Sequence, residues 1–553
     1  MNMKIKTLLY FLLIINIPLL LFGQNFPDLP ESEDTPRSFF SRKDSINSLK
    51  SLKEEIDEVL KNANLSRTDY SIAIYSLDQD EYIYEKNIND ALTPASNTKL
   101  FTTFTVLSLF GKDYHIPTIV YADEKPGKDS ILNGNLYIVG NGDALLSVTD
   151  IEYIADELRN SGIKQINGNI YGDDTFFDSI TDRKLYAGDD DHVEKLPPIT
   201  ALCIEKNIVQ ILVRAGSING EKVQVQTIPA SDAFRLDIDA KVTGGRKSGK
   251  NDDIEMDNID LDLPEEYYGN YQEHPVSYYG GGHPAKLASS GTGRIYISSK
   301  LGDDGYQDLR VSGSLRAGRT YYYSYHILNP ALAVAGALKD RLNFGGIPVN
   351  GDIGKKSIND MDSLNKPIFY AVFQRPITDI LYLVNKNSDN YLAETMFKMI
   401  GAYQNLDNHT GRSCQKAMRK LFHSKGINCE NCQLNDGSGL SRRNLCTTGS
   451  IIELLRNAFH SDFYAVFDST LSIAGIDGTL EKRMLIGLAE NNLRGKTGTL
   501  RNVSALSGYV NTLDGERLAF SFIFNGPNVG LYKSLEDELG EILSQFFYYN
   551  VEN

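Results

Sequence analysis

Several motifs that define common enzyme classes are absent from this sequence of 553 residues. The eight histidines are scattered, and the His-Glu-x-x-His pair of zinc peptidases does not occur. The Gly-x-Ser-x-Gly nucleophile elbow of α/β-hydrolases is missing as well. A phosphate-binding P-loop that ended at Lys496 would need glycine at position 490, which is Glu490. The sequence therefore supports neither a zincin, an α/β-hydrolase nor a nucleotide-binding enzyme, and we expect no metal and no cofactor.

Positive charge is also in short supply. Lysine and arginine number 56 against 72 aspartates and glutamates, which gives a net charge of −16. No dense lysine and arginine run offsets this deficit, so we expect no nucleic-acid partner. Hydrophobic residues at 41% and charged residues at 23% are ordinary for globular proteins and exclude a largely disordered or fibrous chain. The length predicts several domains.

Long apolar runs are confined to the N-terminus. Residues 8–22 are apolar except for Asn16 and Pro18, follow Lys4 and Lys6, and precede the small Gly23. This run is shorter than the roughly 20 residues of a membrane span, so we predict a secretory signal peptide at 1–23. Residues 24–44 then form a linker, and the protein is expected in the periplasm or cell envelope. An uncleaved N-terminal anchor and a peripheral membrane contact are left open.

Cysteines number only five, and four of them lie near one another in the sequence. Cys429 and Cys432 form a Cys-x-x-Cys pair, with Cys414 before it and Cys446 after it. Four such residues could bind zinc, but an exported protein meets oxidising conditions and no second close pair is present. Disulfides or unpaired thiols are favoured over zinc, and the pairing is left open.

Apolar periodicity predicts regular elements at both ends of the chain. Hairpins are expected at 71–77 with 81–85 and at 504–510 with 518–524, and helices at 49–60, 100–109, 329–342, 376–384, 390–402 and 535–547. Between about 113 and 370, short β-like runs alternate with glycine and aspartate turns. We therefore predict one discontinuous α/β domain from residues 45–115 and 375–553. Residues 116–374 would form a β-rich insertion of two nested subdomains.

Three short motifs carry the chemistry. Ser96 and Lys99 lie three residues apart at the start of an apolar helix, so they share a face, and a lysine with a lowered pKa can activate the serine. The triplet Ser388-Asp389-Asn390 lies between two predicted helices, and Lys496-Thr497-Gly498-Thr499 precedes the last hairpin. Gly498 would let a substrate backbone approach the strand. Each motif has look-alikes elsewhere in the chain, but only these three combine the right order, spacing and context.

With these motifs the sequence resembles the penicillin-binding D-alanyl-D-alanine carboxypeptidases of the peptidase S13 class. The stretches Asp-Gly-Ser-Gly-Leu-Ser-Arg at 436–442 and Ala-Gly-Ile-Asp-Gly-Thr-Leu at 474–480 strengthen the resemblance. It implies an α/β (α+β) fold, in which a β-lactamase/transpeptidase-like antiparallel sheet is flanked by helices and carries a large β-rich two-domain insertion. It also implies an exported serine-type carboxypeptidase, with DD-endopeptidase activity, that acts on peptidoglycan stem peptides and binds β-lactams covalently.

The resemblance also implies roles for single residues. Ser96 would be the nucleophile and Lys99 its base, and Ser388 and Lys496 would relay a proton to the leaving D-alanine. Asn390 would hold the substrate amide. Lys496, Thr497 and Thr499 would bind the terminal carboxylate, and the N–H groups of Ser96 and Thr499 would form the oxyanion hole.

One departure from the family concerns specificity. Family members often place an acidic residue, with tryptophan nearby, where this chain has Asp189, Asp190 and Asp191 but no tryptophan at all. We predict that Asp190 meets the amino group of the diamino acid in the peptide. The alternative is an ordinary solvated acidic loop.

Two other functions stay open at this point. A β-lactamase could use the same catalytic core, although the insertion and the length disfavour it. A catalytically silent wall-binding or penicillin-sensing protein would not need the lysine base. The sequence does not give the oligomeric state.

Overall fold

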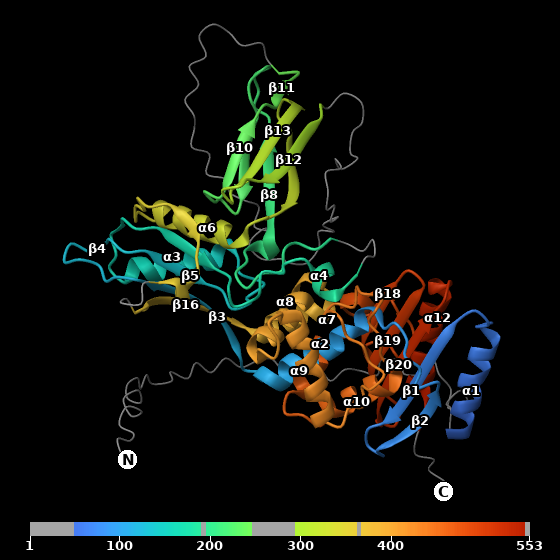
Figure 1. The fold of residues 1–553 in the computed structure, drawn as a ribbon. Coiled ribbons are helices and arrows are strands. Elements are labelled where there is room, and N and C mark those ends of the chain that lie inside the picture. The colour runs from blue at the N-terminus through green and yellow to red at the C-terminus, as the bar shows by residue number, and fades with distance from the viewer. Residues whose placement is uncertain (1–48, 190–194, 246–292, 362–365, 548–553) are drawn as a thin grey trace, which may run out of the picture. The chain divides into compact units, whose positions relative to one another are not determined.

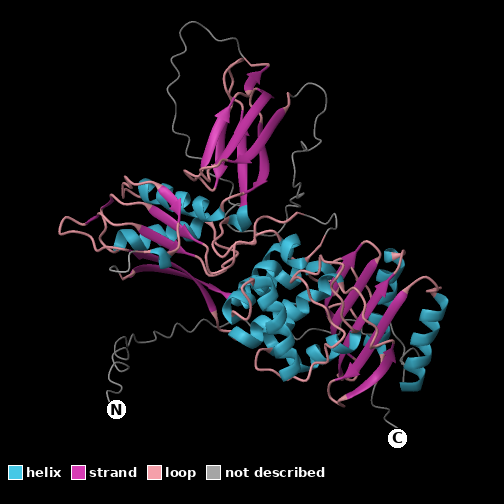
Figure 2. Ribbon diagram, in the orientation of Figure 1, coloured by secondary structure: helices cyan, strands magenta, loops and turns pink. Residues whose placement is uncertain are grey.

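The computed structural model describes residues 49–189, 195–245, 293–361 and 366–547 (Figure 1). Helices and sheets alternate along these residues, in a mixed α/β fold (Figure 2). The predicted signal peptide and linker and Asp190 lie outside the described residues. No helix within the described ranges is long and apolar enough to cross a membrane.

The two ends of the chain share one antiparallel sheet. Its strands lie in the order β17-β18-β19-β20-β1-β2, and β1 pairs with β20 along its whole length. The strands are β1 (Asp69–Ser76), β2 (Glu81–Lys86), β17 (Ser472–Ile473), β18 (Arg494–Leu500), β19 (Val503–Asn511) and β20 (Arg517–Asn525). Both predicted hairpins are therefore confirmed, and strands more than 400 residues apart in the sequence are neighbours.

Helices cover both faces of this sheet. On one face lie α1 (Leu49–Asn62) and α12 (Val529–Gln545), whose apolar side chains share a core with β1, β19 and β20. On the other face lies a group of α-helices that share a second core with the sheet: α2 (Thr98–Phe110), α7 (Ile377–Lys386), α8 (Asn390–Gln404), α9 (Thr410–Ser424), α10 (Thr448–Phe459) and α11 (Tyr464–Thr470). The sandwiched sheet confirms the fold class that the sequence predicted.

Helix α2 lies at the centre of the helical group. All of its residues from Thr98 to Leu107 are buried, which explains why its apolar residues are not confined to one face. Gly111 ends the helix with a φ of 81°. The buried part of this helix is the rigid support that carries Lys99.

The segment between the two parts of the sheet begins with one strand and ends with another, and these two strands pair with each other. Strand β3 (His115–Ala122) pairs antiparallel with β16 (Ile368–Pro376), close to both predicted domain boundaries. They belong to a sheet of order β15-β7-β5-β3-β16, with β5 (Leu136–Val139), β7 (Ile170–Asp173) and β15 (Ile353–Lys355). Helices α3 (Val148–Asn160) and α6 (Pro330–Phe344) share its core. The division into domains at 115 and 375 stays a prediction.

Further strands in this segment form three small sheets. One has the order β14-β8-β9, a second joins β10, β11 and β12 to β13, and a third pairs β4 with β6. Their bounds are β4 (Ile131–Leu132), β6 (Gln165–Ile166), β8 (Ile208–Arg214), β9 (Gln224–Ile228), β10 (Phe234–Ile238), β11 (Lys241–Thr243), β12 (Ile295–Leu301), β13 (Gln307–Arg316) and β14 (Thr320–His326). The short helix α4 (Arg183–Ala187) follows β7.

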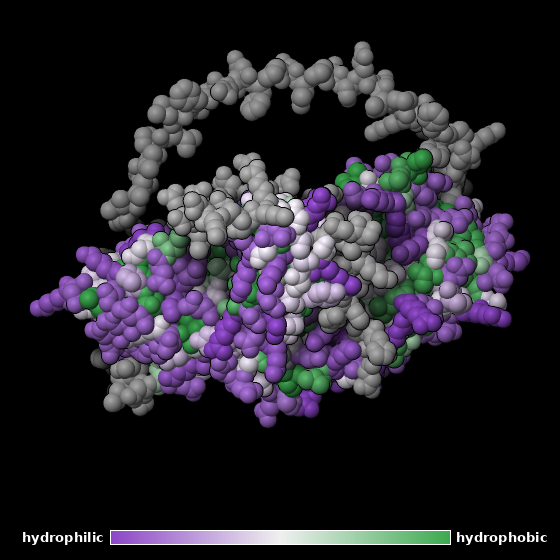
Figure 3. Space-filling view, turned by 90° about the horizontal axis from the view of Figure 1, so that it is seen from above, coloured by the Kyte–Doolittle hydropathy of each residue, from purple (hydrophilic) through white to green (hydrophobic). Residues whose placement is uncertain are grey.

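The structure also settles the state of the cysteines. Cys429 and Cys432 form a disulfide, whereas Cys203, Cys414 and Cys446 are buried thiols. Within the described residues, no cluster of three or more histidine, cysteine, aspartate or glutamate side chains could hold a metal ion. Hydrophilic residues cover much of the face seen in Figure 3, and apolar residues appear on it in separate patches.

Candidate active site

Ser96 lies in a tight turn at the entrance of α2. The turn is a short 3₁₀ helix, η2 (Ala95–Asn97), which follows Pro94 and leads directly into the helix that carries Lys99. The Lys99 Nζ donates a hydrogen bond of 3.1 Å to the Ser96 Oγ. The spacing of three residues therefore brings the Lys99 amine to the Ser96 hydroxyl, and the roles of base and nucleophile stay predictions.

Lys99 is completely buried and is oriented by two further acceptors. Its Nζ donates 2.7 Å to the Asn390 Oδ1 and 2.6 Å to the main-chain oxygen of Ser438. Asn390 is the first residue of α8, and Ser438 belongs to the loop between α9 and α10. Three segments that are distant in the sequence thus define the position of the Lys99 amine. The contact with Asn390 brings the Ser-Asp-Asn motif next to the Ser-x-x-Lys motif.

Lys496 lies on β18 with its side chain completely buried. Burial lowers the pKa of its amine well below the usual 10.5, and the positive charge of Lys99 lowers it further. The Lys496 Nζ donates 3.0 Å to the main-chain oxygen of Thr497. An amine with a lowered pKa gives up its proton more readily than a free lysine, which suits the proton relay that the sequence predicts for Lys496.

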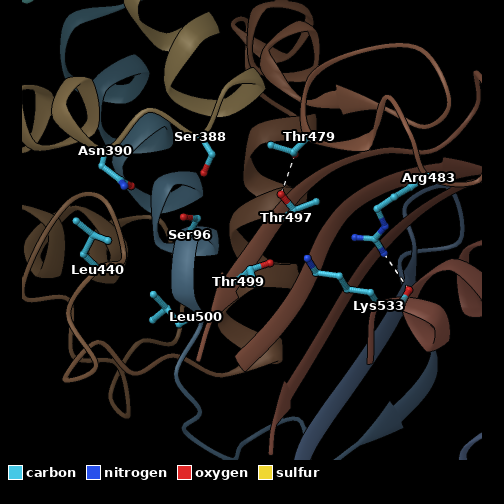
Figure 4. Close-up of a pocket in the computed structure, with 10 residues that line it drawn as sticks. All are labelled: Ser96, Ser388, Asn390, Leu440, Thr479, Arg483, Thr497, Thr499, Leu500 and Lys533. Carbon is cyan, nitrogen blue, oxygen red and sulfur yellow. Dashed lines mark hydrogen bonds between the residues drawn. The ribbon is translucent and has the colours of Figure 1, made fainter. Parts of the chain in front are cut away.

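Ser388 occupies the connection between α7 and α8 in the left-handed region, with a φ of 55°. Asp389 holds this turn, because its side chain caps α8 by accepting 3.0 Å from the Leu392 N–H and pairs with Lys206 at 2.8 Å. The strained turn directs the Ser388 side chain into the cleft, on the same side as Ser96 (Figure 4).

The cleft in front of Ser96 has a volume of about 340 Å³. Among the predicted residues, Ser96, Ser388, Asn390, Thr497 and Thr499 line it, whereas Lys99 and Lys496 are buried behind its wall. It is also lined by residues to which the sequence analysis gave no role: Leu440, Thr479, Arg483, Leu500 and Lys533 (Figure 4). Leu440 and Thr479 lie in the two stretches that resemble the family, at 436–442 and 474–480, and this resemblance was the only hint in the sequence that they belong to the site. Arg483 and Lys533 have no motif around them.

Strand β18 presents its threonines to the cleft and its glycine to the nucleophile turn. Thr497 donates from its Oγ1 to the Thr479 Oγ1 at 2.8 Å, and Thr499 is exposed at the cleft. A Cβ on Gly498 would lie 2.6 Å from the Pro94 oxygen. Gly498 therefore lets the strand approach the turn of Ser96, which is a use that differs from the predicted approach of substrate. Its role in substrate binding stays a prediction.

The acidic loop predicted to face the substrate is described only at its start. Asp189 is buried, pairs with Arg183 at 2.6 Å and accepts 2.6 Å from the Ser441 hydroxyl. This residue is therefore neither a solvated loop residue nor free to meet a substrate amine. Asp190, for which substrate recognition was predicted, lies outside the described residues.

Comparison with known proteins identifies relatives along most of the chain. The model of the D-Ala-D-Ala carboxypeptidase 3 (S13) family matches residues 52–261 and 301–545. A D-alanyl-D-alanine carboxypeptidase from Actinomadura sp. (strain R39) is 28% identical over 509 residues, which cover 90% of this chain and 85% of that protein. The D-alanyl-D-alanine carboxypeptidase DacB of Haemophilus influenzae is 24% identical over 459 residues, with coverage of 82% and 85%.

A solved structure shows the same fold. The crystal structure of penicillin binding protein 4 (dacB) from Haemophilus influenzae superposes with a TM-score of 0.63 at 21% identity and covers 88% of this chain and 99% of that one. The same protein complexed with a β-lactam superposes with a TM-score of 0.59.

Proposed function

This chain belongs to the D-Ala-D-Ala carboxypeptidase 3 (S13) family, and on that premise we propose that it is a serine-type D-Ala-D-Ala carboxypeptidase with an acyl-enzyme on Ser96. The observation that carries the assignment to Ser96 is its 3.1 Å hydrogen bond with the buried amine of Lys99 at the wall of the cleft. Of the four Ser-x-x-Lys tetrapeptides in the sequence, the one at Ser96 opens the helix that faces this cleft.

Acylation requires the unprotonated amine of Lys99, which takes the Ser96 hydroxyl proton as the Oγ attacks the carbonyl carbon of the penultimate D-alanine. The N–H groups of Ser96 and Thr499 stabilise the resulting oxyanion. The C–N bond then breaks, and Lys496 and Ser388 relay the proton that Lys99 took from Ser96 to the departing amine of the terminal D-alanine. Water hydrolyses the ester and restores Ser96, so that one water is consumed for each D-alanine released.

Substrate contacts follow from the positions of the lining residues. Thr497 and Thr499 are placed to hold the terminal carboxylate at the cleft edge of β18, supported by the charge of Lys496 when it is protonated. Asn390 directs its Oδ1 to Lys99, which leaves its amide nitrogen for a substrate carbonyl. Gly498 keeps the strand close to the nucleophile. Asp190 is proposed to recognise the amino group of the diamino acid.

The same carbonyl occurs in cross-linked stem peptides, so we extend the proposal to DD-endopeptidase action on cross-linked dimers. Penicillins carry an acyl group and a carboxylate in a comparable arrangement and would trap Ser96. Export by the N-terminal signal places the enzyme in the periplasm or cell envelope, where its substrate lies. The mass of the protein purified from its host tests export, because cleavage after Gly23 leaves Gln24 as the first residue.

The deciding experiment combines intact mass after penicillin treatment with D-alanine release from a synthetic stem pentapeptide. The wild type should form one stable adduct and release D-alanine, and Ser96→Ala should do neither. Ser161→Ala removes the exposed serine of another Ser-x-x-Lys tetrapeptide and should behave as wild type. Rapid penicillin turnover without D-alanine release would instead indicate a β-lactamase, and a folded protein without adduct or release would indicate a silent wall-binding protein.

A further inference from the structure

The carbonyl that holds Lys99 belongs to a peptide group with a second buried partner. The Ser438 oxygen accepts from Lys99 at 2.6 Å, and the N–H at the other end of the same peptide, that of Gly439, donates 2.8 Å to the Asp436 Oδ1. A peptide group is planar, so fixing its N–H also fixes the direction of its carbonyl. A carboxylate on the N–H also polarises the amide and strengthens its oxygen as an acceptor.

This turn also touches the backbone of the nucleophile turn. Gly439 has a φ of 84°, and a Cβ at this position would lie 1.9 Å from the Ala95 oxygen. A rotation of the Ser438–Gly439 peptide would therefore move both the acceptor of Lys99 and the support of Ser96.

Asp436 is held in place by an arginine from the inserted segment. Its Oδ2 accepts 2.8 Å from Arg183 and 2.8 Å from the Ser441 N–H, and its Oδ1 accepts 2.6 Å from the Asn444 side chain. Arg183 begins α4, is 2% exposed and also pairs with Asp189. One guanidinium thus pairs with two buried carboxylates, and its removal would leave both without this cation.

A second contact from α4 reaches the other side of Ser438. The Tyr186 hydroxyl donates 2.7 Å to the Glu394 Oε2, and the Glu394 Oε1 accepts 2.8 Å from the Ser438 N–H. The N–H groups of Ser438 and of Gly439 are therefore both bound to carboxylates, and each carboxylate has a partner on α4.

We propose that Arg183 and Tyr186 are positioning residues for Lys99, because through Asp436 and Glu394 they fix the two peptide groups on either side of Ser438, whose carbonyl holds the amine beside Ser96. The inference rests on the proposed function, in which Lys99 is the base. Helix α4 of the segment between β3 and β16 would then help to position the catalytic lysine. Neither residue touches the substrate, so their loss affects the chemical step and leaves binding intact.

The test is an Arg183→Gln variant with a matched control. Arg375→Gln removes another guanidinium, on β16, which bridges Asp143 and Asp150 rather than Asp436. Acylation by penicillin, kcat and KM for D-alanine release, and thermal unfolding are measured for each protein. A displacement of about 1 Å in a reacting group costs on the order of 10²-fold in rate. We expect a comparable loss of kcat and of acylation rate in Arg183→Gln at nearly constant KM, and partial recovery in Arg183→Lys.

The control separates positioning from general stability. Arg375→Gln should lose stability but keep its acylation rate. Equal rate losses in the two glutamine variants, or full rate in Arg183→Gln, would overturn the inference. A wild type that neither acylates nor releases D-alanine would refute the proposed function instead.

Tyr186→Phe provides a second route if Arg183→Gln does not fold. The change removes only one hydroxyl, so it keeps the volume of the side chain while it frees the Glu394 carboxylate. We expect a smaller loss of kcat, on the order of tenfold, at unchanged KM. A wild-type kcat in this variant would refute the contact through Glu394, and with it the role of α4 on that side of Ser438.

Discussion

Replacing Gly498 by alanine tests how closely strand β18 must lie against the nucleophile turn. The new Cβ would meet the Pro94 oxygen at 2.6 Å, the Ala505 Cβ at 3.2 Å and the Ala95 Cβ at 3.3 Å. Ordinary contact begins near 3.4 Å, so strand and turn must separate by about 0.8 Å. The neighbours are backbone and short side chains, which cannot move aside independently.

This displacement has two measurable consequences. Overpacking of this kind typically costs about 1–3 kcal/mol of stability. Because a shift of about 1 Å in a reacting group costs roughly 10²-fold in rate, acylation of Ser96 by penicillin should fall by about 30–100-fold. The Cβ faces Pro94 rather than the cleft, so KM for the peptide should change little. Timed quenching with intact mass measures acylation, and urea unfolding measures stability.

Gly495→Ala is the matched control on the same strand. Its Cβ would meet the Leu506 Cδ1 at 3.0 Å, the end of a side chain that can rotate away. We expect it to cost less than about 1 kcal/mol and to acylate within threefold of wild type. Wild-type acylation in Gly498→Ala, or equal losses in both variants, would refute the reasoning. A large rise in KM with unchanged acylation would instead favour the substrate-binding role that the sequence suggested for Gly498.

Three further predictions concern buried charges around the site. Lys496→Met should abolish acylation yet stabilise the protein at pH 7 by about 0.5–2 kcal/mol. The pKa of Lys496 in the folded protein lies well below 10.5, so the wild type should gain stability as pH rises from this folded pKa towards 10.5. Urea unfolding at several pH values should show this gain in the wild type and not in Lys496→Met. Burial and the nearby Asp436 raise the pKa of Glu394 from 4.5 to about 7, so the wild type should lose stability, on the order of 3 kcal/mol, as pH rises through that range, and unfolding of Glu394→Gln should lack this loss. Asp389→Ala removes the cap of α8 and should cost about 1 kcal/mol in thermal unfolding and lower kcat, whereas Asp389→Asn, which keeps the cap, should retain most of the stability.

Local signals in the sequence were sufficient for much of the fold. The periodic leucines of α1, the two hairpins and the apolar run of α2 predicted elements that the structure contains. Helix α3 was missed, although Ser147 and Asp150 form a capping box at its start. Helix α9 was not predicted either. Its buried residues Cys414, Met418 and Phe422 recur every four positions, but Cys414 was interpreted only as a candidate for a disulfide or a zinc site.

In the candidate site, too, the sequence predicted the local contacts but not the contacts between distant segments. The hydrogen bond between Ser96 and Lys99 is local, so a spacing of three residues on a helical turn predicted it. The loop that supplies the Ser438 carbonyl was noticed only as a family-like stretch, because a main-chain acceptor leaves no trace in residue type. Arg483 and Lys533 reach the cleft from segments whose composition is ordinary.

The sequence by itself determined which residue types are available and which of them form helices, strands and turns, because backbone propensity and apolar periodicity act over a few neighbours. Only the tertiary structure decided that Asn390 and Ser438 orient Lys99, that Gly498 lets β18 approach the turn of Ser96 and that Arg183 binds Asp436. These contacts join segments tens to hundreds of residues apart. The lowered pKa of Lys496 has the same origin, since desolvation and the charge of Lys99 exist only once the chain has folded around both amines.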